Sequence, residues 1–104
     1  MVAKNRSKQA TAHTDDITAL ALSPRRDWVA TGQVGLAPLI FIWSSDAAKT
    51  RYPGPIKLPK GARAVTALGF NDKGTRLAAT DLSNEHVVYI YDLNPKRPEL
   101  VYSK

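Results

Sequence analysis

The chain repeats its own pattern once, at an offset of 48 residues and without a gap. Residues 17–45 align with residues 65–93, and most apolar positions of the first stretch meet apolar or small residues in the second. A period of this length is typical of repeat architectures, in which each unit is one supersecondary element that buries its faces against its neighbours. The sequence therefore predicts two similar units that stack on each other.

Length and composition describe an ordinary folded chain. At 104 residues, with 43% hydrophobic and 23% charged residues, it has the size and balance of one globular domain. No apolar run approaches the roughly 18 residues that span a bilayer, and the basic N-terminal stretch lacks the apolar core of a signal peptide. The sequence has no cysteine, which excludes disulfides, thiolate zinc sites and cysteine nucleophiles. We therefore expect a cytoplasmic chain with no membrane contact.

The net charge of +6 is distributed unevenly along the chain. Residues 1–12 carry +3, residues 44–64 carry +4 and residues 94–104 carry +2, whereas both repeats are slightly acidic. The excess positive charge thus lies in a leading tail, in the connection between the units and in the trailing segment. This distribution suits an acidic partner, although solvated lysines that keep loops soluble are the commoner cause of such a pattern.

Each unit has the pattern of short strands separated by turns. Residues 39–43 (LIFIW) and 87–91 (VVYIY) give the strongest signal, because β-branched and aromatic residues favour strands. The near-continuous apolar run at residues 17–22 predicts a strand that is buried on both faces between packed sheets. Turn-forming residues predict hairpin connections at residues 23–27 and 71–75. Further strands are predicted at residues 28–31, 56–58, 76–80 and 99–102.

These elements predict an all-β fold made of two antiparallel four-stranded units. Prolines flank the predicted strands at residues 56–58 and 99–102, and because proline cannot donate to a strand ladder they indicate edge positions. The first unit is expected over residues 13–60 and the second over residues 61–104, after a basic flexible tail at residues 1–12.

A unit of about 40 to 48 residues that opens near a histidine and closes its third strand with tryptophan resembles a β-propeller blade of the WD-repeat type. In that family a histidine, a serine or threonine and the tryptophan belong to a hydrogen-bonded set that pins each blade. The matching residues are His13, Thr31 and Trp43. The resemblance implies that this chain holds two blades of an incomplete WD-type propeller.

The second unit departs from this pattern. Gly61 stands in place of the histidine, and Tyr91 and Asp92 stand where the Trp-Asp pair of the family would fall. The resemblance therefore implies that Tyr91 and Asp92 pin the second blade, and pin it less well. Closed propellers need roughly 4 to 8 blades, because closure protects the edge strands. We therefore expect further blades, from a longer chain, from another chain or from several copies of this one, to complete the ring.

Two sequence segments resemble one particular family of WD-repeat proteins. HTDDITALALSP (residues 13–24) and, one blade later, DLSNEHVVYIYD (residues 81–92) are similar to early blades of the echinoderm microtubule-associated-protein-like family. This resemblance implies a noncatalytic scaffold that is part of a cytoskeleton-associated protein, binds microtubules or tubulin, and needs no cofactor.

The sequence offers no convincing catalytic, cofactor or metal site. Residues 13–16 (HTDD) supply one imidazole and two carboxylates, but no second histidine lies nearby to complete a ligand set. There is no Gly-x-Ser-x-Gly elbow and no spaced serine, histidine and aspartate set that would serve a nucleophilic mechanism. We therefore predict that the chain is not an enzyme.

The predicted functional surface consists of loops, since partners commonly dock on loops held by a rigid scaffold. An acidic partner, such as the acidic tails of tubulin that the resemblance implies, would bind there with strong salt dependence. The alternative is a nucleic-acid-binding or ribonucleoprotein component that contacts phosphate through its basic tail and loops. The candidate partner-binding residues are Lys49, Arg51, Lys57, Lys60, Arg63, Asn84, Glu85 and His86.

Overall fold

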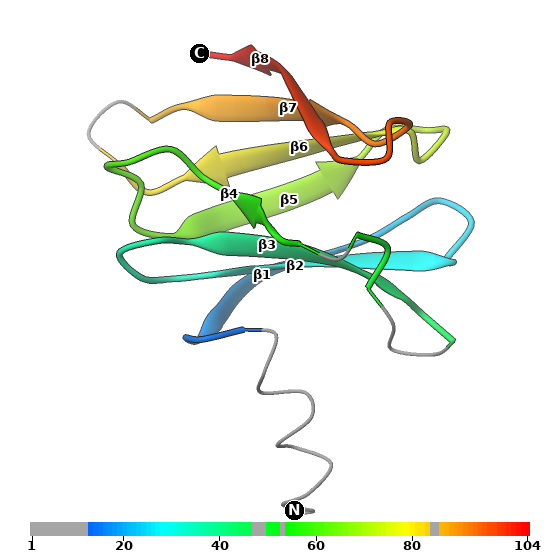
Figure 1. Cartoon of the computed structure of the whole chain (residues 1–104), viewed down its shortest axis with the longest axis horizontal. Coiled ribbons are helices and arrows are strands. Elements are labelled where there is room, and N and C mark those ends of the chain that lie inside the picture. The colour runs from blue at the N-terminus through cyan, green and yellow to red at the C-terminus, as the bar shows by residue number, and fades with distance from the viewer. Residues whose placement is uncertain (1–12, 47–49, 53, 84–85) are drawn as a thin grey trace, which may run out of the picture.

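The computed structural model describes residues 13–46, 50–52, 54–83 and 86–104, which form two four-stranded antiparallel sheets (Figure 1). Each sheet is a simple meander in which strands that follow one another in the chain are neighbours. The all-β prediction is thus confirmed, whereas the predicted tail at residues 1–12 lies outside the described residues. The first sheet contains β1 (Ile17–Leu22), β2 (Trp28–Gln33), β3 (Leu39–Ser44) and β4 (Ile56–Lys57), and the second contains β5 (Val65–Phe70), β6 (Arg76–Asp81), β7 (Val88–Asp92) and β8 (Glu99–Ser103).

The two predicted hairpin turns are present and are held by their own side chains. In the first turn Ser23 Oγ donates to Asp27 Oδ1 at 2.7 Å and accepts from the Trp28 amide at 3.1 Å. In the second turn Asn71 Oδ1 accepts from the backbone amides of Thr75 at 2.8 Å and Arg76 at 3.0 Å. Short polar side chains of this kind stabilise turns because they accept hydrogen bonds from the backbone amides of the turn.

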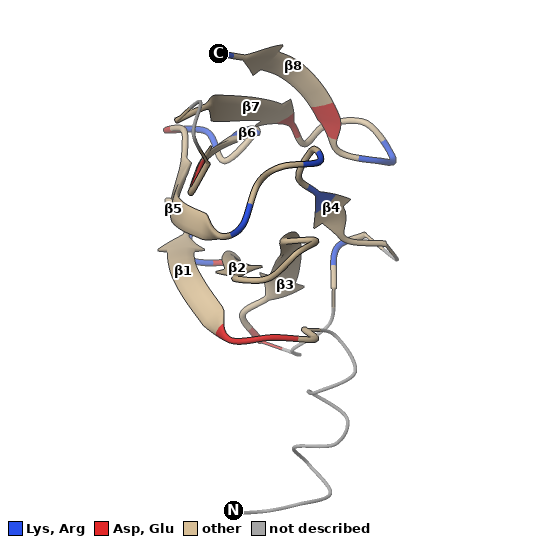
Figure 2. Ribbon diagram, turned by 90° about the vertical axis from the view of Figure 1, so that its left-hand side faces the viewer, with Lys and Arg blue, Asp and Glu red and all other residues tan. Residues whose placement is uncertain are grey.

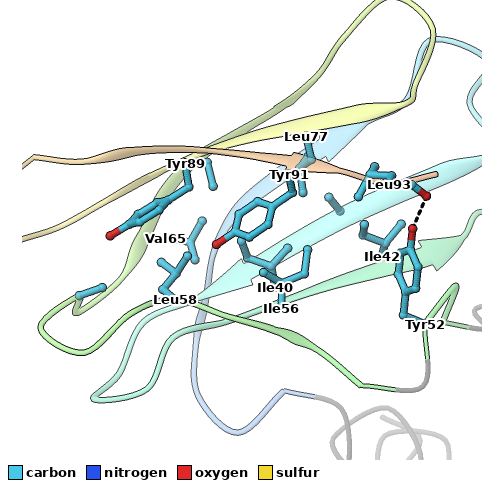
Figure 3. Close-up of a cluster of buried hydrophobic side chains, with 13 residues drawn as sticks. Ile40, Ile42, Tyr52, Ile56, Leu58, Val65, Leu77, Tyr89, Tyr91 and Leu93 are labelled. Atoms are coloured by element: carbon cyan, nitrogen blue, oxygen red, sulfur yellow. Dashed lines mark hydrogen bonds between the residues drawn. The ribbon is translucent and has the colours of Figure 1, made fainter. Parts of the chain in front are cut away.

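A single apolar layer lies between the two sheets (Figure 3). Along β3, Ile40 and Ile42 point into this layer, while Phe41 and Trp43 point to the opposite face, as the alternation of a strand requires. Tyr89 and Tyr91 of β7 occupy the positions one repeat after Phe41 and Trp43, and they point into the layer from the other side. The two sheets therefore stack in the same orientation, the front of one on the back of the next. The layer comprises Ala30, Ile40, Ile42, Tyr52, Ile56, Leu58, Ala62, Val65, Leu77, Ala79, Tyr89, Tyr91 and Leu93.

The prediction that residues 17–22 are buried on both faces was wrong. The side chains of Ile17, Leu20 and Leu22 are 54%, 66% and 47% exposed. The reason is topological: β1 pairs only with β2 and is an edge of its sheet in the described part of the chain. Only Ala19 and Ala21 are half-buried, and Ala19 packs against the apolar layer.

The two sheets approach each other closely at Gly32 of β2 and Val65 of β5. A Cβ atom built on Gly32 would lie 2.5 Å from Val65 Cβ and 2.6 Å from Val65 Cγ1. Val65 is fully buried and β-branched, so its side chain has no free rotamer to move into. Thr18 Oγ1 donates to the Val65 carbonyl at 2.7 Å and ties β1 to the same point. Glycine at position 32 is therefore required for the two blades to meet.

We predict that Gly32→Ala lowers the free energy of unfolding by about 2 kcal/mol, because the added methyl group overpacks a site that cannot expand. Urea unfolding at one fixed protein concentration measures this. Gly69→Ala in β5 is the matched control, since a Cβ there meets nothing within 4 Å. We expect the control to change stability by no more than about 0.5 kcal/mol. Equal effects of the two substitutions would contradict the close contact between the blades.

Candidate protein-binding surfaces

The outer face of the first blade carries a chain of hydrogen bonds centred on Thr31. Trp43 Nε1 donates to Thr31 Oγ1 at 2.7 Å, and His13 Nε2 lies 2.6 Å from the same oxygen. His13 Nδ1 lies 2.7 Å from Gln33 Oε1, which can only accept, so Nδ1 carries a proton, and in the neutral ring Nε2 accepts from the Thr31 hydroxyl. The structure thus brings His13, Thr31 and Trp43 together, with Gln33 as a fourth member that the sequence did not single out.

Aromatic contacts hold the His13 imidazole in this hydrogen-bonded set. The His13 ring meets the Phe41 ring edge-on, with centroids 4.8 Å apart, and the Phe41 and Trp43 rings are 5.6 Å apart. These contacts join the segment before β1 to strand β3. We propose that this set pins the first blade.

The second blade has a different polar cluster, centred on Asp81. The Tyr89 hydroxyl donates to Asp81 Oδ2 at 2.7 Å, and the Ser83 hydroxyl donates to Asp81 Oδ1 at 2.8 Å. The Val87 amide also donates to Oδ1, at 3.1 Å. Sequence reasoning missed this cluster, although a signal was available: Asp81 and Tyr89 lie one repeat after Gln33 and Phe41.

The ionisation of this cluster follows from its hydrogen bonds. Burial alone would raise the pKa of Asp81, but the bonds from Tyr89, Ser83 and Val87 outweigh it, and the pKa of Asp81 lies below its usual value. Burial, together with the bond to Asp81, raises the pKa of Tyr89. At neutral pH the pair is therefore a carboxylate and a neutral phenol.

Tyr91 and Asp92, which were predicted to pin the second blade together, lie on opposite faces of β7. Tyr91 is buried in the apolar layer, its ring stacks on Tyr89 with centroids 6.5 Å apart, and burial raises its pKa to about 12. Asp92 is half-buried and accepts a hydrogen bond from the Asn94 amide at 3.1 Å. Tyr91 thus belongs to the contact between the blades and Asp92 to the turn after β7.

Arg51, a predicted partner-binding residue, braces the two blades. One of its guanidinium nitrogens donates to the Leu93 carbonyl at 2.7 Å, and its guanidinium carbon lies 5.5 Å from the Trp28 ring centroid and 5.3 Å from that of Tyr52. The Tyr52 hydroxyl donates to the same carbonyl (Figure 3). Arg51 is half-buried, and these contacts hold its side chain against other residues of the chain.

Lys57 lies on a groove between the outer strands of the two blades, which we call the basic groove. It has a volume of about 780 Å³, with Tyr52, Ile56, Tyr91 and Leu100 among the residues that line it. The exposed side chains of Lys57, Lys96 and Arg97 also line the groove, and Figure 2 shows this positive charge on β4 and on the turn before β8. Lys96 and Arg97 were absent from the predicted set.

The remaining predicted residues lie elsewhere. Lys60, Arg63 and His86 are exposed at the end of the blades where the β4–β5 and β6–β7 connections meet. Backbone bonds fix this end, since the Gly35 amide donates to the Arg63 carbonyl at 2.7 Å. The structure therefore divides the predicted basic surface into two separate regions. Lys49, Asn84 and Glu85 lie outside the described residues.

Within residues 13–46, 50–52, 54–83 and 86–104, no three His, Cys, Asp or Glu side chains are grouped so that they could hold a metal ion. A helix with the length and apolarity to cross a membrane is likewise not found in the described part of the chain.

Comparison with known proteins agrees with this architecture. The family model of the WD domain, G-beta repeat, matches residues 5–44. A ciliary WD repeat-containing protein, ctxp80, from Euplotoides octocarinatus is 43% identical over 82 residues, which are 79% of this chain and 11% of that protein. Human echinoderm microtubule-associated protein-like 1 is 38% identical over 90 residues, with 77% of this chain and 11% of that protein covered. The chain thus spans about a ninth of the length of these relatives.

A solved structure shows the same fold. The crystal structure of Saccharomyces cerevisiae Sqt1 superposes with a TM-score of 0.70 at 22% sequence identity, and the match covers 88% of this chain and 24% of that one. At this identity the likeness concerns the fold alone.

We predict that Thr31→Val lowers the free energy of unfolding by about 2 kcal/mol, because the Trp43 Nε1 donor and the His13 ring both lose a partner in a partly buried site. Thermal or urea unfolding measures this. Thr66→Val is the matched control, since its hydroxyl bonds to Thr80 on the surface, and it should cost no more than about 0.5 kcal/mol. A cost for Thr31→Val as small as that of the control would refute the pinning role.

Proposed function

We infer that this chain, a WD-repeat chain whose sequence resembles the echinoderm microtubule-associated proteins, is a noncatalytic interaction module of a cytoplasmic, microtubule-associated protein. The observation that carries this proposal is the similarity to relatives whose names record microtubule association, over more than three quarters of the chain. Because the chain spans only a small part of those relatives, their binding is proposed for it and tested below.

The basic groove supports an acidic protein partner. Lys57, Lys96 and Arg97 supply positive charge along its margins, and the groove floor carries the tyrosines Tyr52 and Tyr91. Aromatic floors with a charged rim suit protein contacts, because the floor excludes water while the rim attracts and orients the partner. We propose that an acidic segment of tubulin binds here.

We also propose that further blades cover the two outer faces. Thr18 of the first blade bonds to the carbonyl of Val65 in the next blade, whereas its equivalent one repeat later, Thr66, bonds to Thr80 of its own sheet. Likewise Ala30 and Ile42 are buried against the second blade, while their equivalents Ala78 and Ile90 are only half-buried. The second sheet thus repeats on its outer face the residues that the first sheet uses to bind a neighbour.

We predict that the chain alone associates with itself at micromolar concentration, because each outer face matches the face of a neighbouring blade. Native mass measurement tests this. Val88→Lys, which places a charge on the outer face of the second sheet, should shift the population toward monomer, and Leu36→Lys, at a fully exposed loop position, should not. A stably folded monomer of the unaltered chain would contradict the proposal that further blades are needed.

For microtubule binding, we predict that the chain co-sediments with microtubules and that binding weakens as salt rises from low to physiological concentration. Replacing Lys57, Lys96 and Arg97 together with glutamate should weaken binding by about tenfold or more. The matched control reverses three exposed charges away from the basic groove, at Lys60, Arg63 and Lys73.

The outcome separates the candidate functions. Equal losses in the groove variant and its control would show that general charge, and not the basic groove, mediates binding. RNA binding measured in parallel addresses the alternative: salt-sensitive binding to RNA without co-sedimentation would replace the microtubule proposal by the nucleic-acid one.

A further inference from the structure

The two blades differ most at the place that His13 fills in the first. There the imidazole lies against Phe41 and bonds to Gln33. One repeat later the histidine is replaced by Gly61, on which a Cβ atom would meet nothing within 4 Å. A pocket of about 440 Å³ lies beside Gly61, and its walls include Asp81 and Tyr89. We call it the Asp81 pocket.

The walls of this pocket present hydrogen-bond acceptors. Asp81 is 6% exposed, and its described hydrogen bonds come from the neutral donors Tyr89, Ser83 and Val87. The Ser83 and Tyr89 hydroxyl groups both give their hydrogen to Asp81, so the lone pairs of their oxygens are what remains for a ligand. A carboxylate also has acceptor sites beyond the three bonds it receives here. The ligand that fits such walls is a donor with positive charge.

The first blade indicates the shape of that ligand. It holds a flat ring in the equivalent place, with a ring N–H aimed at the residue that aligns with Asp81. A guanidinium group is planar, always charged and rich in donors, and it stacks on aromatic faces such as that of Tyr89. We propose that the Asp81 pocket binds the guanidinium group of an arginine side chain presented by a partner protein. This pocket is separate from the basic groove, so the proposal does not depend on microtubule binding.

A lysine of the chain itself lies near. Lys60 also lines the pocket, and its side chain is exposed. If its ammonium visits Asp81, it competes with the ligand. Lys60→Met removes the competitor and should leave arginine binding equal or stronger.

The test uses the full chain, with acetyl-arginine-amide as the probe and acetyl-citrulline-amide as its neutral counterpart of nearly the same shape. Amide chemical shifts are followed by NMR at physiological salt. We expect saturable shifts at Gly61, Ser83 and Val87 with the arginine probe, and binding at least about tenfold weaker with the citrulline probe. Asp81→Asn should weaken arginine binding by a similar factor.

A second variant covers the case in which Asp81→Asn fails to fold. Ser103→Trp places a ring at the rim of the pocket and leaves the described bonds of Asp81 in place, and it should also block binding. The Trp43 indole signal reports in each variant whether the first blade stays folded. Equal binding of the two probes, unchanged binding in both variants, loss of binding in Lys60→Met, or shifts confined to the acidic segment at Asp15 and Asp16 would each overturn the proposal.

Discussion

Val65 of β5 lies directly against the backbone of β2 at Gly32, and this contact sets how closely the two sheets approach. From it the apolar layer extends outward through Ile40 and Leu77, which are fully buried. Each aliphatic side chain removed from water in such a layer contributes about 1.5 to 3 kcal/mol, and the benefit is lost wherever the sheets separate. The Asp81 cluster, the Arg51 brace and both pockets lie at the margins of this layer.

The two blades are alike at their apolar positions and differ around the position of His13. Stacking in one orientation requires each blade to have a back that fits the front of the next, so the apolar positions are retained. The residues around the His13 position can differ between blades, because different side chains can satisfy the hydrogen bonds of buried polar groups there. The first blade uses His13 and Gln33, and the second uses Asp81 and Tyr89. The exchange leaves a buried carboxylate beside an open space.

Much of the fold was predictable from the sequence, because strand and turn signals are local. The runs at residues 39–43 and 87–91 and the turn residues near Ser23 and Asn71 predicted strands and hairpins that the structure contains. Burial was less predictable, since it depends on which strand lies at an edge. The apolar run of β1 suits a buried strand, yet β1 has a single strand neighbour in the described residues.

Side-chain roles were predictable only where a residue matched a known pattern. His13, Thr31 and Trp43 were found by their type, and the structure places them together. Asp81 was overlooked because its role comes from alignment with Gln33 and not from its residue type. Arg51 was predicted as a partner-binding residue from its charge, and charge alone does not reveal that the Leu93 carbonyl and two aromatic rings lie within its reach.

We infer that one apolar layer makes the two blades a single cooperative unit. Native-state hydrogen exchange, measured at the amides of β2 and β3 and of β6 and β7 as denaturant increases, tests it most directly. We expect the slowest amides of both sheets to exchange with the same free energy and the same denaturant dependence. Exchange of the β6 and β7 amides through an opening that leaves β2 and β3 protected would contradict it.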